Sequence, residues 1–249
     1  MKEVSMDLFC EGIDGLIDVL YDTQKENLAA AGTACKEAIA KGGVIQVFGS
    51  GHSLGFGLEM INRVGSLVPV HVIKTSDFVI EGKVSYEEFT DKNNVFERRP
   101  YIADKMYDLY NIGKNDAFII ISNSGINGLV IDMAIKAKKE GHKVICVTSM
   151  KHTTAVTSRH PSGKKLYQIA DIVIDNCGPH GDALLETDQV EKVCSVSAIT
   201  GVLIAQSIEL ETVKQLQEAG VEAPILWDTR LEGAKHHNHE LIQKYSDRI

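Results

Sequence analysis

The 249-residue sequence lacks the features that mark several classes of protein. Its five cysteines are odd in number and form no C-x-x-C pair, which argues against a disulfide framework or a zinc ribbon and favours buried free thiols. No run of about 18 apolar residues occurs, and the N-terminal 30 residues contain no cationic leader segment. We therefore expect a soluble, cytoplasmic protein that does not engage membranes.

Basic charge is also scarce. The chain has 26 Lys and Arg against 34 Asp and Glu, a net charge of −8. Binding to nucleic acid needs a concentrated basic surface, so we do not expect a nucleic-acid partner. The proportions of hydrophobic residues (44%) and charged residues (24%) are typical of a globular chain, and internal repeats and low-complexity tracts are absent.

Apolar segments alternate with helix-like segments through the middle of the chain. Strands are predicted near residues 44–48, 70–73, 118–121, 144–148 and 172–175, with helix-like stretches near 53–66, 98–110, 127–140 and 153–159. Strands that are apolar at nearly every position, with a helix between successive strands, indicate a parallel sheet covered on both faces. The predicted fold class is α/β, a three-layer, doubly wound sheet of five parallel strands.

The flanking segments are assigned to the same single domain, residues 1–249. Residues 1–42 are predicted to form a helical arm, because apolar side chains recur at helical spacing up to the glycine pair 42–43. Residues 43–219 form the α/β core, which ends in one long helix predicted over about 188–219, a packing or dimer element. Residues 220–249 form a tail, and the polar stretch 76–97 is predicted to be a functional loop, a lid or a subunit contact.

Two loops rich in Gly and Ser follow predicted strands. The first reads Gly49-Ser50-Gly51-His52-Ser53, and the second reads Ser122-Asn123-Ser124-Gly125-Ile126-Asn127. Such loops offer backbone N–H groups, small hydroxyls and the positive end of a helix dipole to an anion. Since ligands of open parallel sheets bind beyond the carboxyl ends of the strands, we expect both loops to hold one phosphorylated ligand.

The second loop resembles the S-x-S-G-x-[ST] phosphate loop of the sugar isomerase (SIS) domain family, and the first is similar to that family's G-x-G-x-S loop. The resemblance covers roughly residues 5–219 and is closest to the phosphoheptose isomerase branch. It implies a phosphosugar ligand and a homodimer or homotetramer. It also implies that the phosphate is held by the hydroxyls of Ser53, Ser122 and Ser124 and by the N–H groups of Gly51 and Gly125.

Other candidate binding residues accompany these. Asn127 stands where the family has Ser or Thr, and its longer side chain can still donate to a phosphate. Asn123 lies inside the second loop, and Asn176 follows the fifth predicted strand, as do His180 and Asp182, which are candidates for contacts with sugar hydroxyls. Ser197, with Ser195 and Thr200, lies where related proteins present hydroxyls to the sugar, although helix packing explains these residues equally well.

The sequence departs from the resemblance on the helix after the first loop. Phosphoheptose isomerases have a zinc-ligand His and, four residues on, a Glu, where this chain has Glu59 and Arg63. An Arg guanidinium stays charged and serves neither as a base nor as a metal ligand. We therefore expect no metal and no other cofactor.

Isomerisation between an aldose and a ketose phosphate needs a base to move a proton and an acid or cation to stabilise the enediolate oxygen. The candidate acid or base groups are His52, Glu59 and Glu97, with Arg63 as a charge stabiliser. Two readings stay open for most of them. Glu59 and Arg63 also fit a surface ion pair at i,i+4, and Glu97 also fits an acid that is favoured at a helix start.

Two further patterns are weaker. The segment His236-His237-Asn238-His239 fits a metal site, a side chain reaching a neighbouring subunit, or a solvated terminus. A dinucleotide site is disfavoured because Leu54 replaces the third glycine of G-x-G-x-x-G and because no acidic residue closes the second strand.

The sequence thus predicts a phosphosugar-binding protein, with aldose/ketose phosphate isomerase as the preferred activity. A lyase of the N-acetylmuramic acid 6-phosphate etherase type is one alternative. A sensor that binds a phosphosugar without turning it over is the other.

Overall fold

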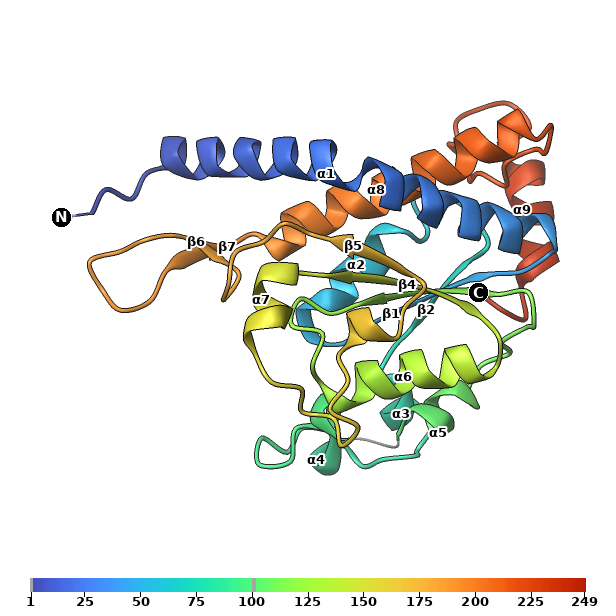
Figure 1. The fold of residues 1–249 in the computed structure, drawn as a ribbon. Helices are drawn as coiled ribbons and strands as arrows, with labels where there is room; N and C mark the ends of the chain where they lie inside the picture. Colours follow the sequence, from blue (N-terminus) through green and yellow to red (C-terminus); the bar gives the residue numbers. More distant parts are fainter. Residues whose placement is uncertain (1, 100–101) are drawn as a thin grey trace.

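The computed structural model describes residues 2–99 and 102–249. At its centre lies a parallel sheet in the order β2-β1-β3-β4-β5, which confirms the predicted five-stranded, doubly wound fold (Figure 1). The strands are β1 (Ile45–Gly49), β2 (Val70–Ile73), β3 (Ala117–Ile121), β4 (Lys143–Thr148) and β5 (Ile172–Asp175).

Helices cover both faces of the sheet (Figure 1). One face carries α1 (Met6–Ala40), α2 (Leu54–Glu59) and α8 (Ser197–Glu218), and the other carries α3 (Asp77–Ile80), α5 (Ala103–Tyr107) and α6 (Gly128–Lys139). Successive strand residues point to opposite faces, so that Ile119 joins the core under α1 and α8 while Phe118 joins the core under α6. Each face therefore has its own apolar core.

The predicted helical arm is one helix of 35 residues. Its buried positions begin at Leu20, and its second half crosses α8 so closely that a Cβ on Gly32 would lie 2.6 Å from Glu211 Cβ. The first half extends past the sheet alongside a hairpin (Figure 1), where a Cβ on Gly12 would meet Leu184. Within the described part of the chain, no helix has both the length and the hydropathy that a membrane span requires.

The long helix begins later than predicted. Residues 183–185 (β6, Ala183–Leu185) and 193–195 (β7, Val193–Ser195) form an antiparallel hairpin, and α8 starts at Ser197. The start is fixed by Asp182, whose Oδ1 accepts from the Ser197 N–H (2.8 Å) and whose Oδ2 accepts from the Ser197 hydroxyl (2.7 Å). A carboxylate that caps the helix from across the hairpin leaves no trace in local apolar spacing.

The polar stretch 76–97 is more ordered than a loop prediction implies. It contains α3, α4 (Tyr86–Phe89) and the start of a 3-10 turn, η2 (Phe96–Arg98). The ring of Phe96 contacts those of Phe78 and Phe89, with centroids 5.6 and 5.1 Å apart, and this aromatic cluster holds the connection against the sheet.

The other predicted helices are shorter than their patterns. In place of the predicted helix 53–66 there is a 3-10 turn, η1 (Gly51–Ser53), followed by α2. In place of the predicted helix 153–159 there is α7 (Met150–Ala155), followed by a loop that ends in η3 (Leu166–Gln168). In the stretch 98–110, α5 is present, and residues 100 and 101 lie outside the described residues.

Three of the five cysteines, Cys35, Cys146 and Cys177, are buried as predicted. Cys10, on the first half of α1, and Cys194, on the hairpin, are exposed, contrary to the prediction.

The last thirty residues pack onto the fold and do not form a solvated tail. They contain α9 (Ala234–Tyr245), whose Tyr245 packs against Val44 and Val68. Beyond it, the Arg248 guanidinium pairs with the buried carboxylate of Asp116, which also accepts from the Val44 N–H (2.9 Å). The ring of His237 stacks on Trp227, and among the described residues no three His, Cys, Asp or Glu side chains gather as a metal site would need.

Replacing Arg248 by Ala is expected to lower the free energy of unfolding by about 3 kcal/mol, because it leaves the Asp116 carboxylate buried without a compensating charge. Urea denaturation followed by circular dichroism measures this loss. Arg230→Ala is the matched control, since it removes a far more exposed Arg–Asp pair and should cost about 0.5 kcal/mol or less. Equal losses in the two variants would contradict the expectation.

Candidate functional site

The two Gly/Ser loops leave the sheet side by side. β1 and β3 are neighbours, and their last residues, Gly49 and Ile121, are paired. After β1 the chain continues to β2 on one side, and after β3 it continues to β4 on the other side. The strand order therefore reverses between β1 and β3. Ligands of doubly wound sheets bind at such a reversal, and the prediction that both loops lie at one edge is confirmed.

The first loop is tightly folded around two glycines. A Cβ on Gly49 would lie 2.7 Å from the Ser53 carbonyl oxygen, and Gly51 has φ +58°, which only glycine adopts easily. The side chain of His52 is exposed, and that of Ser53 is half-buried. Neither has a hydrogen-bond partner within the described residues, so both groups are available to a ligand.

The second loop is held from behind by a distant segment. The Arg159 N–H donates to the Ile126 carbonyl (3.0 Å) and the Leu166 N–H donates to the Gly125 carbonyl (2.9 Å). Gly125 has φ +61°, and a Cβ there would meet the hydroxyl of Thr153 at 3.0 Å. These contacts occupy carbonyl groups of the loop and turn its other side toward the carboxyl edge of the sheet.

The serines of this loop differ in their hydrogen bonds. The Gly125 N–H donates to Ser122 Oγ (3.1 Å), so this N–H is used inside the loop and is not free for a phosphate, as the resemblance implies it should be. The Ser122 hydroxyl still has its own proton to donate. The hydroxyl of Ser124 is half-buried and has no hydrogen-bond partner among the described residues.

Several predicted binding residues already have partners within the protein. Asn123 Oδ1 accepts from Asn176 Nδ2 (2.8 Å), and Asn176 Oδ1 accepts from the Gly178 N–H (2.9 Å). Ser197 is bound to Asp182 at the start of α8. The exposed ring of His180 stacks on that of His152, with centroids 4.8 Å apart. The pKa of His152 is lowered by burial and further by the neighbouring His180.

Glu97 reaches both loops. Its Oε1 accepts from Asn127 Nδ2 (3.2 Å), and its Oε2 lies 3.5 Å from the place a Cβ on Gly51 would occupy. Asn127 Oδ1 in turn accepts from Arg159 Nη1 (2.9 Å). The structure therefore brings Glu97 to the ligand edge, and it adds Arg159, which the sequence analysis did not select.

Glu59 and Arg63 form the ion pair that the sequence left open. The second carboxylate oxygen of Glu59 accepts from Gln206 Nε2 on α8 (3.2 Å), and the Arg63 N–H donates to Ser66 Oγ in the turn before β2. Among the described residues, neither side chain is hydrogen-bonded to either loop. The spacing i,i+4 on α2 and the turn that follows explains their pairing.

A cavity of about 310 Å³ opens beside the first loop. Its lining includes Ser50 and Gly51 of the first loop and Thr75, two residues after β2. The 76–97 connection supplies the remaining lining residues, which are Phe89, Thr90, Asp91, Lys92, Val95, Phe96 and Glu97. No pattern in the sequence indicates that Thr75 or Thr90 lines a site, because their contribution depends on how the connection folds back over the loop.

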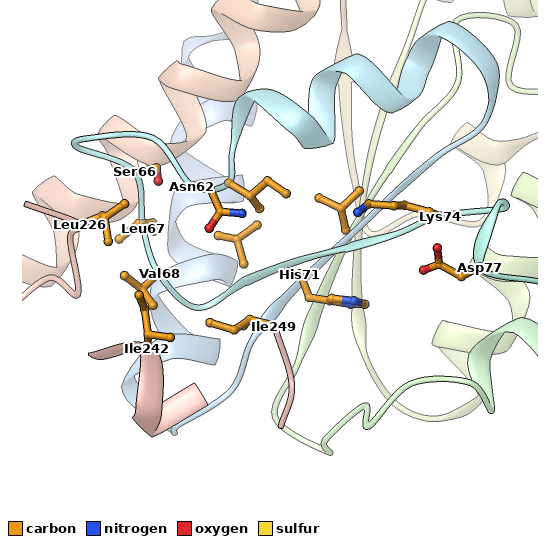
Figure 2. A pocket seen from close by; sticks show the side chains of 13 residues that line it. Asn62, Ser66, Leu67, Val68, His71, Lys74, Asp77, Leu226, Ile242 and Ile249 are labelled. Carbon is orange, nitrogen blue, oxygen red and sulfur yellow. The ribbon is translucent and has the colours of Figure 1, made fainter. Parts of the chain in front are cut away.

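A second cavity, of about 410 Å³, follows the free edge of β2 (Figure 2). Lys74 and Asp77 lie at one end, His71 lies in the middle, and Leu226 and Ile242 lie toward the other end. None of the predicted site residues lines it. It is therefore separate from the two loops.

The geometry can be compared with that of known proteins. Residues 8–149 match the SIS domain family. The chain belongs to this family. It is 35% identical to a UPF0309 protein of Geobacillus sp. over 97% of this chain and 96% of that one, and 36% identical to a UPF0309 protein of Caldanaerobacter subterraneus over 98% of each. These relatives place the SIS-domain chain in the UPF0309 family and confirm the resemblance drawn from its loops.

Solved structures agree on the fold. A phosphoheptose isomerase from Neisseria gonorrhoeae superposes with a TM-score of 0.53 at 17% identity, covering 83% of this chain and 96% of that one. A phosphoheptose isomerase from Francisella tularensis gives a TM-score of 0.52 at 16% identity, with 82% and 96% coverage. At such identity the likeness shows the SIS fold alone.

Next to the Glu59–Arg63 pair, α8 of the SIS domain carries a buried carboxyl group. Glu209 is 6% exposed, and its Oε1 accepts from the Leu67 N–H (2.9 Å). Burial raises the pKa of Glu209 to about 7; the bond from Leu67 opposes this rise, Glu59 adds to it, and Arg63 opposes it. Between about pH 4.5 and pH 7 the folded state therefore binds more protons at Glu209 than the unfolded chain does.

Because the pKa of Glu209 is raised in the folded state, its contribution to stability is full below about pH 4.5 and is lost as the pH rises through 7. Glu209→Gln should remove this loss. As the pH rises from 5 to 8, the free energy of unfolding of the variant should therefore increase relative to that of the wild type by on the order of 2 kcal/mol. Denaturation midpoints across this range measure the gain. Glu211→Gln, on the same helix, is the control, and its unfolding free energy should change with pH as that of the wild type does. The prediction is refuted if the unfolding free energy of Glu209→Gln also changes with pH as that of the wild type does.

Proposed function

We propose that this SIS-domain protein binds a phosphorylated sugar at the carboxyl edge of its sheet and interconverts the aldose and ketose forms. The observation that carries the proposal is a pair of hydroxyls, those of Ser53 and Ser124, that have no hydrogen-bond partner in the described part of the chain. They lie on loops that leave neighbouring strands at the reversal of strand order. Both loops lead into helices, where free N–H groups favour an anion. In a chain of net charge −8, such a local arrangement of donors is what a small phosphate ester requires.

In this proposal the hydroxyls of Ser53, Ser122 and Ser124 and the N–H of Gly51 hold the phosphoryl oxygens. Asn123 and Asn176 bind each other and so keep the second loop in shape. The cavity of about 310 Å³ beside Gly51 takes the sugar, whose hydroxyls can reach Thr75, Thr90 and Lys92. Ser197 is available from the start of α8 once its bond to Asp182 is exchanged.

Glu97 is the base we assign, because it contacts the first loop and borders the sugar cavity. Its carboxylate would take the proton from the carbon next to the carbonyl and return it to the former carbonyl carbon. His52 would give a proton to the carbonyl oxygen as the enediol forms and take one from the neighbouring hydroxyl as the new carbonyl forms. The Glu59–Arg63 pair is a second acid/base and charge candidate, at the end of α2. That the neighbouring folds include phosphoheptose isomerases supports an isomerase as the reaction class.

Two substitutions separate binding from chemistry. Ser124→Ala should weaken the binding of fructose 6-phosphate or a related hexose phosphate, seen as a smaller thermal shift, because one charge-assisted hydrogen bond is lost. Glu97→Gln should keep the thermal shift and lower turnover about 100-fold or more, since a positioned base typically contributes that much. Turnover is followed as aldose–ketose conversion by NMR over a panel of sugar phosphates.

Ser246→Ala and Glu87→Gln are the matched controls, because both side chains are exposed and lie outside the site. A thermal shift without product from any substrate would support the phosphosugar sensor, and release of lactate from a muramic acid 6-phosphate would support the lyase. An undiminished thermal shift in Ser124→Ala combined with Ser53→Ala would overturn the phosphate site.

We also propose that the protein is a homo-oligomer. On α8, Ile199, Val202 and Leu210 fall on one helix face and are exposed, Leu210 by 66%. The first half of α1 and the hairpin add further exposed apolar side chains, among them Met6, Tyr21 and Val190. An apolar stripe of this kind on a helix that already packs by its other face is typical of a subunit contact.

Light scattering should therefore give a mass that is a multiple of 27.3 kDa, and Val202→Glu with Leu210→Glu should shift it toward 27.3 kDa. Both changes place a charge in the apolar contact, where its desolvation is costly. Val64→Glu, at an exposed turn residue elsewhere, should leave the mass unchanged. A wild-type mass of 27.3 kDa would contradict the proposal.

A further inference from the structure

Arg159 is fixed beside the second loop from two directions. Its N–H donates to the Ile126 carbonyl of that loop (3.0 Å). The next residue, His160, is buried and joins Asp132 on α6 (2.8 Å) and Ser162 (2.7 Å) through its two ring nitrogens. The backbone that carries Arg159 is therefore bound both to the loop and to the helix that the loop precedes.

The guanidinium of Arg159 meets the loop through Asn127. Arg159 Nη1 donates to Asn127 Oδ1 (2.9 Å), and Asn127 Nδ2 donates to Glu97 Oε1 (3.2 Å). Among the described residues this is the one hydrogen bond that the guanidinium makes, although it carries five N–H donors. The residue as a whole is exposed, and its guanidinium is bonded to Asn127, which directly precedes α6.

The amide of Asn127 separates a positive and a negative side chain. Its oxygen faces Arg159 and its NH₂ group faces Glu97, so the amide is oriented by both charges. A Ser or Thr at this position has a shorter side chain with a single oxygen, and it would not span both partners. The Asn that departs from the family's loop pattern thus has a structural reason in this chain.

A phosphate at the two loops would lie near the Glu97 carboxylate, which contacts Gly51 of the first loop. Two anions at such short range repel each other unless a cation compensates. Arg159 is the cation that is bonded to the second loop itself, through both its backbone and its side chain.

We propose that Arg159 is a ligand-binding residue that contacts the phosphoryl group directly. Asn127 is a positioning residue, whose amide holds Arg159 at one end and Glu97 at the other. The inference rests on the proposed phosphosugar site and deepens it. It assigns to the site a preference for dianionic phosphate esters, because a fixed guanidinium matches two phosphoryl oxygens and gains most from the second charge.

The test is the dissociation constant of fructose 6-phosphate and of inorganic phosphate, measured by calorimetric titration. Arg159→Gln should weaken both about ten-fold or more, and Arg159→Lys should recover only part of the loss, because a lysine cannot bind two oxygens in a fork. Lys164→Gln is the matched control, since it removes one positive charge from an exposed side chain of the same segment. It should change binding by less than about two-fold.

The role of Asn127 is tested by a double-mutant cycle. Asn127→Ser should weaken phosphate binding on its own, and it should add little in the Arg159→Gln background, because both changes remove the same contact. Melting temperatures of all variants are recorded without ligand, and a merely structural role would lower them without this coupling. Full additivity of the two losses in binding overturns the positioning role.

The outcomes separate this inference from the function on which it rests. If Ser124→Ala weakens binding while Arg159→Gln and Lys164→Gln both bind as the wild type does, the phosphate site stands and the role of Arg159 is refuted. The role of Arg159 is also refuted if Lys164→Gln and Arg159→Gln lose affinity equally, since the loss of one positive charge anywhere in the segment then explains the effect. If the wild-type protein binds neither fructose 6-phosphate nor phosphate, the proposed function itself fails.

Discussion

The pairing of β1 with β3 is the constraint on which the candidate site depends. Gly49 is paired with Ile121 at the carboxyl ends of these strands, and the chain leaves them in opposite directions. No connecting helix therefore separates the loops that follow, and a ligand can contact both at once. The apolar cores on the two faces of the sheet fix this register, because a shift by one residue would exchange the side chains that face α1 and α8 with those that face α6.

The loops are shaped by close packing and by hydrogen bonds to carbonyl groups of the second loop, which leave the hydroxyls of Ser53 and Ser124 without a partner among the described residues. Residues 159 and 166 bind carbonyl groups of the second loop, and Gly125 is approached so closely by Thr153 that a larger residue would displace the loop. In the first loop the same closeness exists between Gly49 and Ser53. What remains toward the ligand edge is a set of hydroxyls and N–H groups, the kind of donors that a small anion requires.

Features set by local pattern were predictable from the sequence, and features set by distant contacts were not. The five strands fall within about a residue of the predicted apolar runs, and both loops lie where their glycines indicated. The start of α8 depends on Asp182 across a hairpin, the packing of α9 depends on Arg248 reaching Asp116, and the place of Arg159 depends on the path of the 156–165 segment. Periodicity carries no information about any of these partners.

Charged residues near the site were the hardest to assign from the sequence, because their roles also depend on distant partners. Glu59 and Glu97 look alike in sequence, each close to a basic residue, and the structure separates them by their partners. Glu59 is bound to Arg63 and Gln206 on the α8 side of the sheet, whereas Glu97 is bound to the amide of Asn127 and contacts the first loop. Glu97 also lines the cavity beside that loop, whereas among the described residues Glu59 is hydrogen-bonded to neither loop. This difference in partner, more than distance along the chain, makes Glu97 the better candidate for proton transfer.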